Sequence, residues 1–231
     1  MQKELGMKAP AAMGRHSLFT TRELTVVGML TGITMLLGLT GYGFIPLPAM
    51  KATILHVPVI IGALVAGPRV GAMVGFLFGI FSLWQAIMAP TILSFAFLNP
   101  LISIVPRVII GIGSYYVFVA CCKFLKKPIA MGIAAVAGSL IFNTGLVMGG
   151  IYLIYAKDFA LAMNISVDAV LAAVLAICAT NGIPEAIVSA AIVVPVVMFR
   201  MSITVIIGKK NLMKTVSFIA LMLLYNLYGR K

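Results

Sequence analysis

Long uninterrupted apolar stretches limit how this chain can fold more than any other feature of its sequence. Of the 231 residues, 62% are hydrophobic and 10% are charged, and a soluble domain of this size cannot bury so much apolar surface. A lipid bilayer can act as the solvent instead, provided that each crossing segment satisfies its own backbone polar groups. Barrel strands alternate apolar and polar side chains, whereas these stretches are continuous over about 20 residues, the length of a membrane helix. The sequence therefore predicts an all-α integral membrane protein.

Six apolar segments make up the predicted membrane domain, which we place at residues 23–200. The second segment has about 13 residues, fewer than the ~20 that a crossing needs, so we expect it to start inside the preceding loop or to be shielded by its neighbours. Residues 1–22 are predicted to form a basic cytoplasmic arm, and residues 201–231 a basic cytoplasmic tail with an interfacial helix at 216–224. The six segments cover residues 24–45, 54–66, 70–89, 101–118, 129–155 and 169–199.

The distribution of basic residues predicts how the chain is oriented. The formal net charge is +12, which in a soluble protein would suggest a nucleic-acid partner. Here the lysines and arginines fall between apolar segments, so the charge reflects topology and no nucleic acid is expected. The arm, the tail and two inner turns carry most of them, while the opposite side holds only Lys51 and Lys157. The basic side should be cytoplasmic, which places both termini inside the cell.

Few polar side chains lie at membrane depth, where they are costly and often functional. Asn143 lies near the middle of the fifth segment. Asn181 and Glu185 lie four residues apart on the sixth, so they share one helix face. Arg107 lies inside the fourth, and the fork of donors on its guanidinium suits a carboxylate or a phosphate. The other candidates for a ligand site near the outer face are Trp84, Gln85, Asn99 and Lys51.

These polar groups have two interpretations. In the first, Arg107 and Glu185 form a buried ion pair and the asparagines make hydrogen bonds between helices. In the second, some of them line a pocket that opens to the outside, where the predicted loops are longer than the inner turns. The two interpretations can coexist, because an anionic ligand can bind beside an existing ion pair.

The sequence argues against enzyme chemistry. It contains five acidic residues in total, without paired carboxylates, a Walker motif or a nucleophile elbow. Its two histidines and three cysteines show no metal-ligand spacing. We therefore expect no catalytic residue, no metal and no cofactor in this chain. Uphill transport would need energy from partner proteins or from an ion gradient.

Three stretches resemble the S components of energy-coupling factor (ECF) vitamin transporters. They are residues 56–69 (HVPVIIGALVAGPR), 99–107 (NPLISIVPR) and 179–186 (ATNGIPEA), and the likeness extends over roughly residues 24–199. It is strongest for the pantothenate-type branch. The resemblance implies six helices in a bacterial plasma membrane, a vitamin pocket near the outer face and both ends inside. It also implies a membrane scaffold subunit and two ATPase subunits as partners, with ATP used by those subunits.

Small residues at helical spacing predict close helix contacts. On the third segment, Gly71, Gly75 and Gly79 continue such a pattern, which we interpret as internal packing. On the first segment, Gly28 and Gly32 occupy the positions at which the resembled family carries an Ala-x-x-x-Ala motif that contacts the scaffold. Glycine keeps the surface small, so the resemblance implies that docking is preserved, although the departure from alanine loosens the match.

The hypothesis from the sequence is an S component that captures a water-soluble vitamin, pantothenate, from the outside. Arg107 would neutralise the carboxylate, Asn143, Asn181 and Gln85 would hydrogen-bond hydroxyl or amide groups, and Trp84 would form an apolar wall. Riboflavin, folate, thiamine precursors and pyridoxine are alternative ligands. A stand-alone proton-coupled transporter that uses Glu185 as its titrating group is an alternative function. A membrane enzyme acting on lipid is a third, against which the lack of convergent acids argues.

Overall fold

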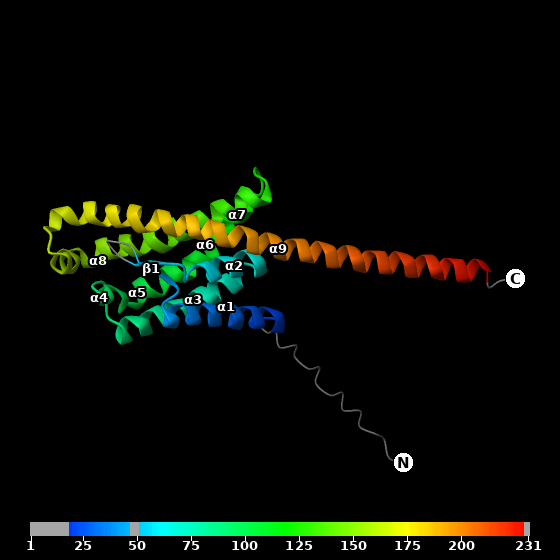
Figure 1. The fold of residues 1–231 in the computed structure, drawn as a ribbon, viewed down its shortest axis with the longest axis horizontal. Helices are drawn as coiled ribbons and strands as arrows, with labels where there is room; N and C mark the ends of the chain where they lie inside the picture. The colour runs from blue at the N-terminus through cyan, green and yellow to red at the C-terminus, as the bar shows by residue number, and fades with distance from the viewer. Residues whose placement is uncertain (1–18, 47–50, 229–231) are drawn as a thin grey trace, which may run out of the picture.

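The computed structural model describes the backbone of residues 19–46 and 51–228 and the side chains of residues 19–44 and 53–203. Apart from one short hairpin, its regular elements are helices (Figure 1). The hairpin pairs β1 (Phe44–Pro46) with β2 (Lys51–Thr53) in an antiparallel register. The longer helices are α1 (Thr21–Thr40), α2 (Val57–Ala66), α3 (Pro68–Met88), α6 (Val105–Cys121), α7 (Lys127–Val136), α8 (Leu146–Met163) and α9 (Val170–Tyr228). The shorter ones are α4 (Ser94–Phe97), α5 (Pro100–Ser103), the π-helix η1 (Ala137–Gly145) and the 3-10 turn η2 (Val167–Ala169).

Within the described residues, five helical stretches are long and apolar enough to cross a membrane. The predicted helical membrane architecture is confirmed to that extent. Helix α2, with ten residues, spans about 15 Å, half of the hydrocarbon thickness. Its side chains Val59, Ile60 and Ala63 are fully buried, so neighbouring helices shield this short segment. The five stretches are Thr21–Thr40, Pro68–Met88, Pro100–Cys121, Lys127–Met163 and Val167–Ile203.

Local signals set the helix ends that frame the bundle. Thr20 and Glu23 form a reciprocal capping box at the start of α1, which satisfies two backbone donors there. Gly41 ends α1 in the left-handed conformation, with a φ of 79°. Gly67, with a φ of 95°, separates α2 from α3. Pro68 then occupies the first turn of α3, where its missing N–H costs nothing.

Glycines bring α3 and α6 into backbone contact. A Cβ atom added at Gly75 would collide with the carbonyl oxygen of Arg107, and one added at Gly79 would lie 2.7 Å from the Cα atom of Ile104. At Gly71 the added atom would lie 3.1 Å from the Cα atom of Gly111. The predicted packing role of the glycines on the third segment is therefore confirmed.

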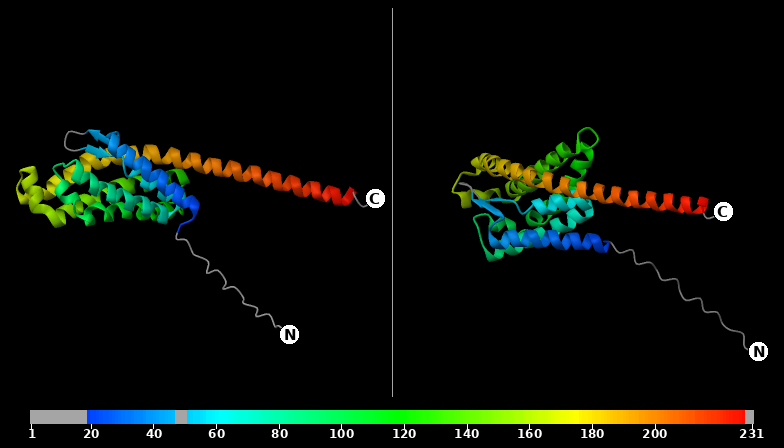
Figure 2. Two further views of the ribbon diagram at one scale, coloured as in Figure 1. Left: turned by 90° about the horizontal axis from the view of Figure 1, so that it is seen from below. Right: turned by 45° about the vertical axis from the view of Figure 1, so that its right-hand side comes forward.

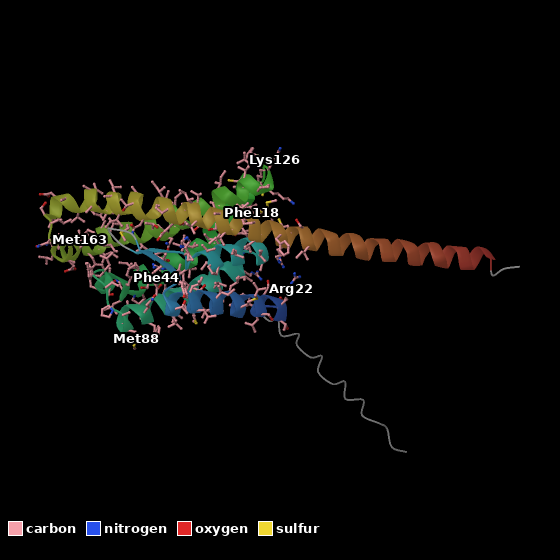
Figure 3. All side chains as sticks on the ribbon, in the orientation of Figure 1. Arg22, Phe44, Met88, Phe118, Lys126 and Met163 are labelled. Atoms are coloured by element: carbon pink, nitrogen blue, oxygen red, sulfur yellow. The ribbon has the colours of Figure 1, made fainter. Side chains whose placement is uncertain are left out.

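The described elements show which connections share an end of the bundle. Figure 3 places Arg22 and Lys126 at one end, and Met88 and Met163 at the opposite end. Helix α9 continues beyond the bundle at the end that holds Arg22, as Figure 2 shows in two further views. It passes position 201, where the tail was predicted to begin, and runs on to Tyr228. The side chains of the predicted interfacial helix lie outside the described residues. Residues 1–18 of the predicted arm also lie outside them.

The buried apolar side chains form two clusters. One contains Ile60, Val74 and Ile110 and joins α1, α2, α3, α6, α7 and the turn of α9 around Val193 and Val197. The other contains Leu93 and Ile151 and joins the segment around α4 and α5 to α8 and the first turns of α9. Side chains from both clusters line a single cavity.

Candidate functional site: a buried cavity with one cation and one anion

The cavity between the two clusters has a volume of about 490 Å³. Its polar lining comes from β2, α3, the segment 91–94, α6, η1 and α9, so segments far apart in the sequence contribute. A cavity of this size with apolar walls and a few convergent polar groups has the character of a small-molecule site. The apolar walls include Phe44, Leu55, Phe78, Leu93, Met148 and Ile177.

Arg107 supplies the positive charge of the cavity. Its side chain is 6% exposed, and its guanidinium lies between the rings of Phe78 and Phe97, at 5.5 Å and 5.2 Å from their centroids. Nη1 donates to the carbonyl oxygen of Ile102 at 2.8 Å, while Nε has no partner among the described residues. A buried cation without an anionic partner is costly. Because Arg107 lines the cavity, an anionic group there would offset that cost.

Glu185 supplies the negative charge. It is 3% exposed, and three donors converge on its carboxylate. The backbone N–H of Thr53 donates to Oε1 at 2.6 Å, and on the other oxygen, Oε2, the Thr144 hydroxyl donates at 2.8 Å and the Asn143 amide at 3.4 Å. Asn143 and Thr144 are consecutive residues of the π-helix η1, which has a wider turn than an α-helix. Both side chains donate to the same carboxylate oxygen.

Two contacts with α9 attach the hairpin and the start of α2 to the bundle. Thr53 of β2 meets Glu185, and His56, three residues further along, lies with Nε2 2.6 Å from the hydroxyl oxygen of Ser189. Glu185 and Ser189 are four residues apart and share one face of α9. Phe44 and Thr53, which are paired across the hairpin, both line the cavity.

The structure combines parts of the two interpretations, since Asn143 of η1 donates to Glu185 of α9 and so makes a hydrogen bond between helices. Among the described residues, Arg107 contacts Ile102 and two phenylalanine rings, and Glu185 contacts Thr53, Asn143 and Thr144. Arg107 and Glu185 do not form the ion pair of the first interpretation, but both line the cavity. The arrangement is a pocket with one group of each sign.

The family of "ECF transporter, substrate-specific component" matches residues 22–197. The chain belongs to this family. It is therefore a transporter component rather than an enzyme, and a multi-pass protein of the bacterial plasma membrane.

Two relatives narrow the comparison within the family of substrate-specific components. The chain is 32% identical over 158 residues to "Pantothenic acid transporter PanT" of Lactococcus lactis subsp. cremoris, which covers 62% of this chain and 74% of the relative. It is 30% identical over 140 residues to "Pantothenate transporter PanT" of Leuconostoc mesenteroides subsp. mesenteroides, which covers 55% of this chain and 67% of the relative.

Five of the eight predicted ligand-site residues lie together in the lining of the cavity. Arg107, Asn143, Asn181 and Glu185 line the cavity, and so does Gln85, whose amide donates to the Gly38 carbonyl at 3.4 Å. Their role in ligand binding stays a prediction.

Trp84 and Asn99 are not among the described residues that line the cavity, and the side chain of Lys51 is not described. Trp84 is 43% exposed and stacks on Phe81 at 5.7 Å. Asn99 caps α5 by accepting from the Leu101 N–H at 2.9 Å, and it donates to the Tyr155 hydroxyl at 3.2 Å. Lys51 lies in β2, but its side chain is outside the described residues.

Sequence reasoning did not single out several hydroxyl groups of the lining. Ser94 accepts from the Thr91 N–H at 2.6 Å, and this three-residue spacing is a recognisable turn signal. Thr53 meets Glu185 through its backbone N–H, which every residue except proline carries, so its sequence holds no signal of this contact. Within the described residues, no group of three or more His, Cys, Asp or Glu side chains could hold a metal ion.

Proposed function

We propose that this substrate-specific component binds pantothenate in the cavity and presents it for uptake. The observation that carries the proposal is the buried guanidinium of Arg107, a residue that lines a cavity of about 490 Å³. Pantothenate has a carboxylate at one end, an amide in the middle, and hydroxyl and methyl groups at the other end. The carboxylate would pair with Arg107, and Asn143, Asn181 and Gln85 would bond the amide and hydroxyl groups. The names of both relatives support this ligand.

The apolar walls complete the proposed fit. Phe78, Val147 and Met148 face the same cavity as the polar groups, so the methyl groups of the ligand would lose contact with water there. The hairpin contributes Phe44 and Thr53 to the lining. We propose that the hairpin closes over the ligand and that Glu185 holds the hairpin in place.

We propose six crossings, made by the five long helical stretches and the short helix α2. We place both termini in the cytoplasm. The basic residues Arg22 and Lys126 lie at one end of the bundle (Figure 3). Ala89, Thr91 and Ile92, which directly follow α3, line the cavity and come from the opposite end. The positive-inside rule supports a cytoplasmic position for the basic end, and the cavity then opens towards the outside.

We also propose that the chain works with a scaffold subunit and two ATPase subunits, which use ATP, while this chain needs no cofactor. Membership of the ECF family supports these partners. The proposed contact face is on α1, where Cβ atoms added at Gly28 or Gly32 would meet no atom within 4 Å. Met29 on the same helix is 68% exposed, so an apolar surface with a shallow centre is open for a helix of the scaffold.

Titration of radiolabelled pantothenate tests the ligand and the role of Arg107. We expect the wild type to saturate and Arg107→Ala to weaken binding by about 30-fold or more, since removing one partner of a buried charge pair costs about 2–5 kcal/mol. Arg69→Ala is the matched control, because Arg69 is exposed on the first turn of α3 and outside the lining. Unchanged affinity in Arg107→Ala would remove Arg107 from the site. A wild type that binds another vitamin in place of pantothenate would refute the proposed ligand.

Co-purification tests the proposed partners. We expect Gly28→Leu and Gly32→Leu to reduce recovery of the scaffold and ATPase subunits, because leucine fills the shallow face. Gly149→Leu is the control, since Gly149 on α8 is equally open, with no atom within 4 Å of an added Cβ. Equal recovery with all three variants would place the docking surface elsewhere. Uptake that persists without partners and collapses with the proton gradient would support the proton-coupled alternative.

A further inference from the structure

We propose that Glu185 makes the cavity selective for ligands with a single negative charge. Resting on pantothenate as the proposed ligand, this inference concerns a second anionic group at the hydroxyl end, such as a phosphate monoester of the same vitamin. Glu185 would oppose that second charge, and the unphosphorylated vitamin would be the form that binds.

The charge balance of the lining carries the first step. Within the described residues, Arg107 is the one cationic side chain of the cavity and Glu185 the one anionic side chain. A ligand carboxylate uses the cation. A further anionic group on the ligand finds no second cation in the described lining, and it shares the cavity with a carboxylate. Burying an unpaired charge is strongly unfavourable.

The contacts of Glu185 carry the second step. Donors from β2 and η1 hold its carboxylate from both sides, through Thr53, Asn143 and Thr144. These three donors fix the position of the carboxylate in the lining. Glu185 is also 3% exposed, so its side chain cannot turn away into solvent to escape an incoming anion.

The size of the cavity carries the third step. A sphere of about 490 Å³ is about 10 Å across, so a second charge on the ligand would lie about 10 Å or less from Glu185. At that distance and at an effective dielectric constant of about 20, repulsion between unit charges corresponds to roughly tenfold in affinity. Because a phosphate monoester carries about −1.5 to −2 at neutral pH, the effect on it is larger.

The test compares the affinity for pantothenate with that for its phosphate monoester at the terminal hydroxyl. The ratio of these affinities is measured by calorimetry in the wild type and in Glu185→Gln. Glutamine has nearly the same shape, can still accept from the Thr53 N–H, and can donate to the Thr144 hydroxyl. The added bulk of the phosphate is the same in both proteins, so the change in the ratio isolates charge. We expect the ratio to fall at least about tenfold in Glu185→Gln.

A second variant keeps Glu185 and adds a cation. Gln85→Lys places a positive charge on a lining position, and it should lower the same ratio by a similar factor. Arg69→Ala, which removes a charge outside the lining, should leave the ratio unchanged. Thermal unfolding shows whether each variant is folded before it is titrated.

The outcomes separate the inference from the proposed function. If all three proteins (wild type, Glu185→Gln and Gln85→Lys) bind pantothenate with the same ratio of affinities for the two forms, selection by charge is overturned. Pantothenate would remain the ligand, and size alone would exclude its phosphate monoester. Selection by charge is also overturned by a wild type that binds both forms equally. A wild type that does not bind pantothenate overturns the proposed function and, with it, this inference.

Discussion

Replacing Gly75 with alanine tests whether the backbone contact between α3 and α6 supports the site. An added Cβ atom would collide with the carbonyl oxygen of Arg107, and it would lie 2.7 Å from the Arg107 carbonyl carbon and 3.2 Å from the Val108 Cα atom. Carbon atoms prefer separations of about 3.5–4.0 Å, so α6 must move back by about 1 Å. The displaced residue is Arg107 itself, which is the cation of the cavity.

The expected magnitude follows from the nature of the obstacle. Overpacking a well-packed interior costs about 1–3 kcal/mol. Because backbone atoms cannot change rotamer to make room, we expect Gly75→Ala to lower the free energy of unfolding by about 3 kcal/mol, or the Tm by about 6–12 °C. Pantothenate affinity should fall as well, since the guanidinium moves relative to the asparagines of η1 and α9.

Intrinsic fluorescence provides the assay, because the chain contains one tryptophan, Trp84, near the end of α3. Gly149→Ala is the matched control: the added Cβ meets no atom within 4 Å, and alanine is the better helix former by about 1 kcal/mol. The control should therefore melt at or above the wild-type temperature. A Gly75→Ala variant that melts together with Gly149→Ala, with unchanged affinity, would refute the reasoning.

Three further substitutions probe single contacts. Ser189→Ala leaves the buried Nε2 of His56 without its partner at 2.6 Å, so stability should fall by about 1–3 kcal/mol in thermal unfolding, and no loss would mean that water replaces the hydroxyl. Tyr155→Phe removes the acceptor of Asn99 at 3.2 Å; because this site is only half-buried, chemical unfolding should show a loss of about 1 kcal/mol or less, and a larger loss would contradict it. Thr144→Val removes one of the three donors to Glu185 and should cost about 1.5–3 kcal/mol, measured against the exposed control Thr25→Val.

The lengths of the apolar stretches predicted the long helices well, because in lipid a helix must satisfy its own backbone. The interruptions were harder to foresee. The connection between residues 89 and 101 was expected as a loop, but Ser94–Phe97 form a short helix there, and the predicted fourth segment is divided into α5 (Pro100–Ser103) and α6. The Ser103 hydroxyl donates to the Phe97 carbonyl and so links the two short helices. Short segments have too few residues for periodicity to show.

The convergence of Asn181 and Glu185 could be predicted because four-residue spacing on a helix defines one face. The same geometry separates the adjacent residues Trp84 and Gln85, since consecutive helical positions do not face the same way. Of these two residues, Gln85 lines the cavity and Trp84 does not. The hairpin contact between Thr53 and Glu185 joins residues 132 apart through a backbone donor, and no local pattern reports such a contact.

The π-helix η1 affects how the site should be compared with that of other proteins. A π-helical stretch bonds each residue one position further along than an α-helix does, as if a residue had been inserted. A relative that keeps a plain α-helix over residues 137–145 would therefore need a one-residue gap there. An alignment without that gap would pair Asn143 and Thr144 with side chains pointing elsewhere. Equivalent pocket positions in this stretch are better assigned by superposing backbones than by aligning sequences.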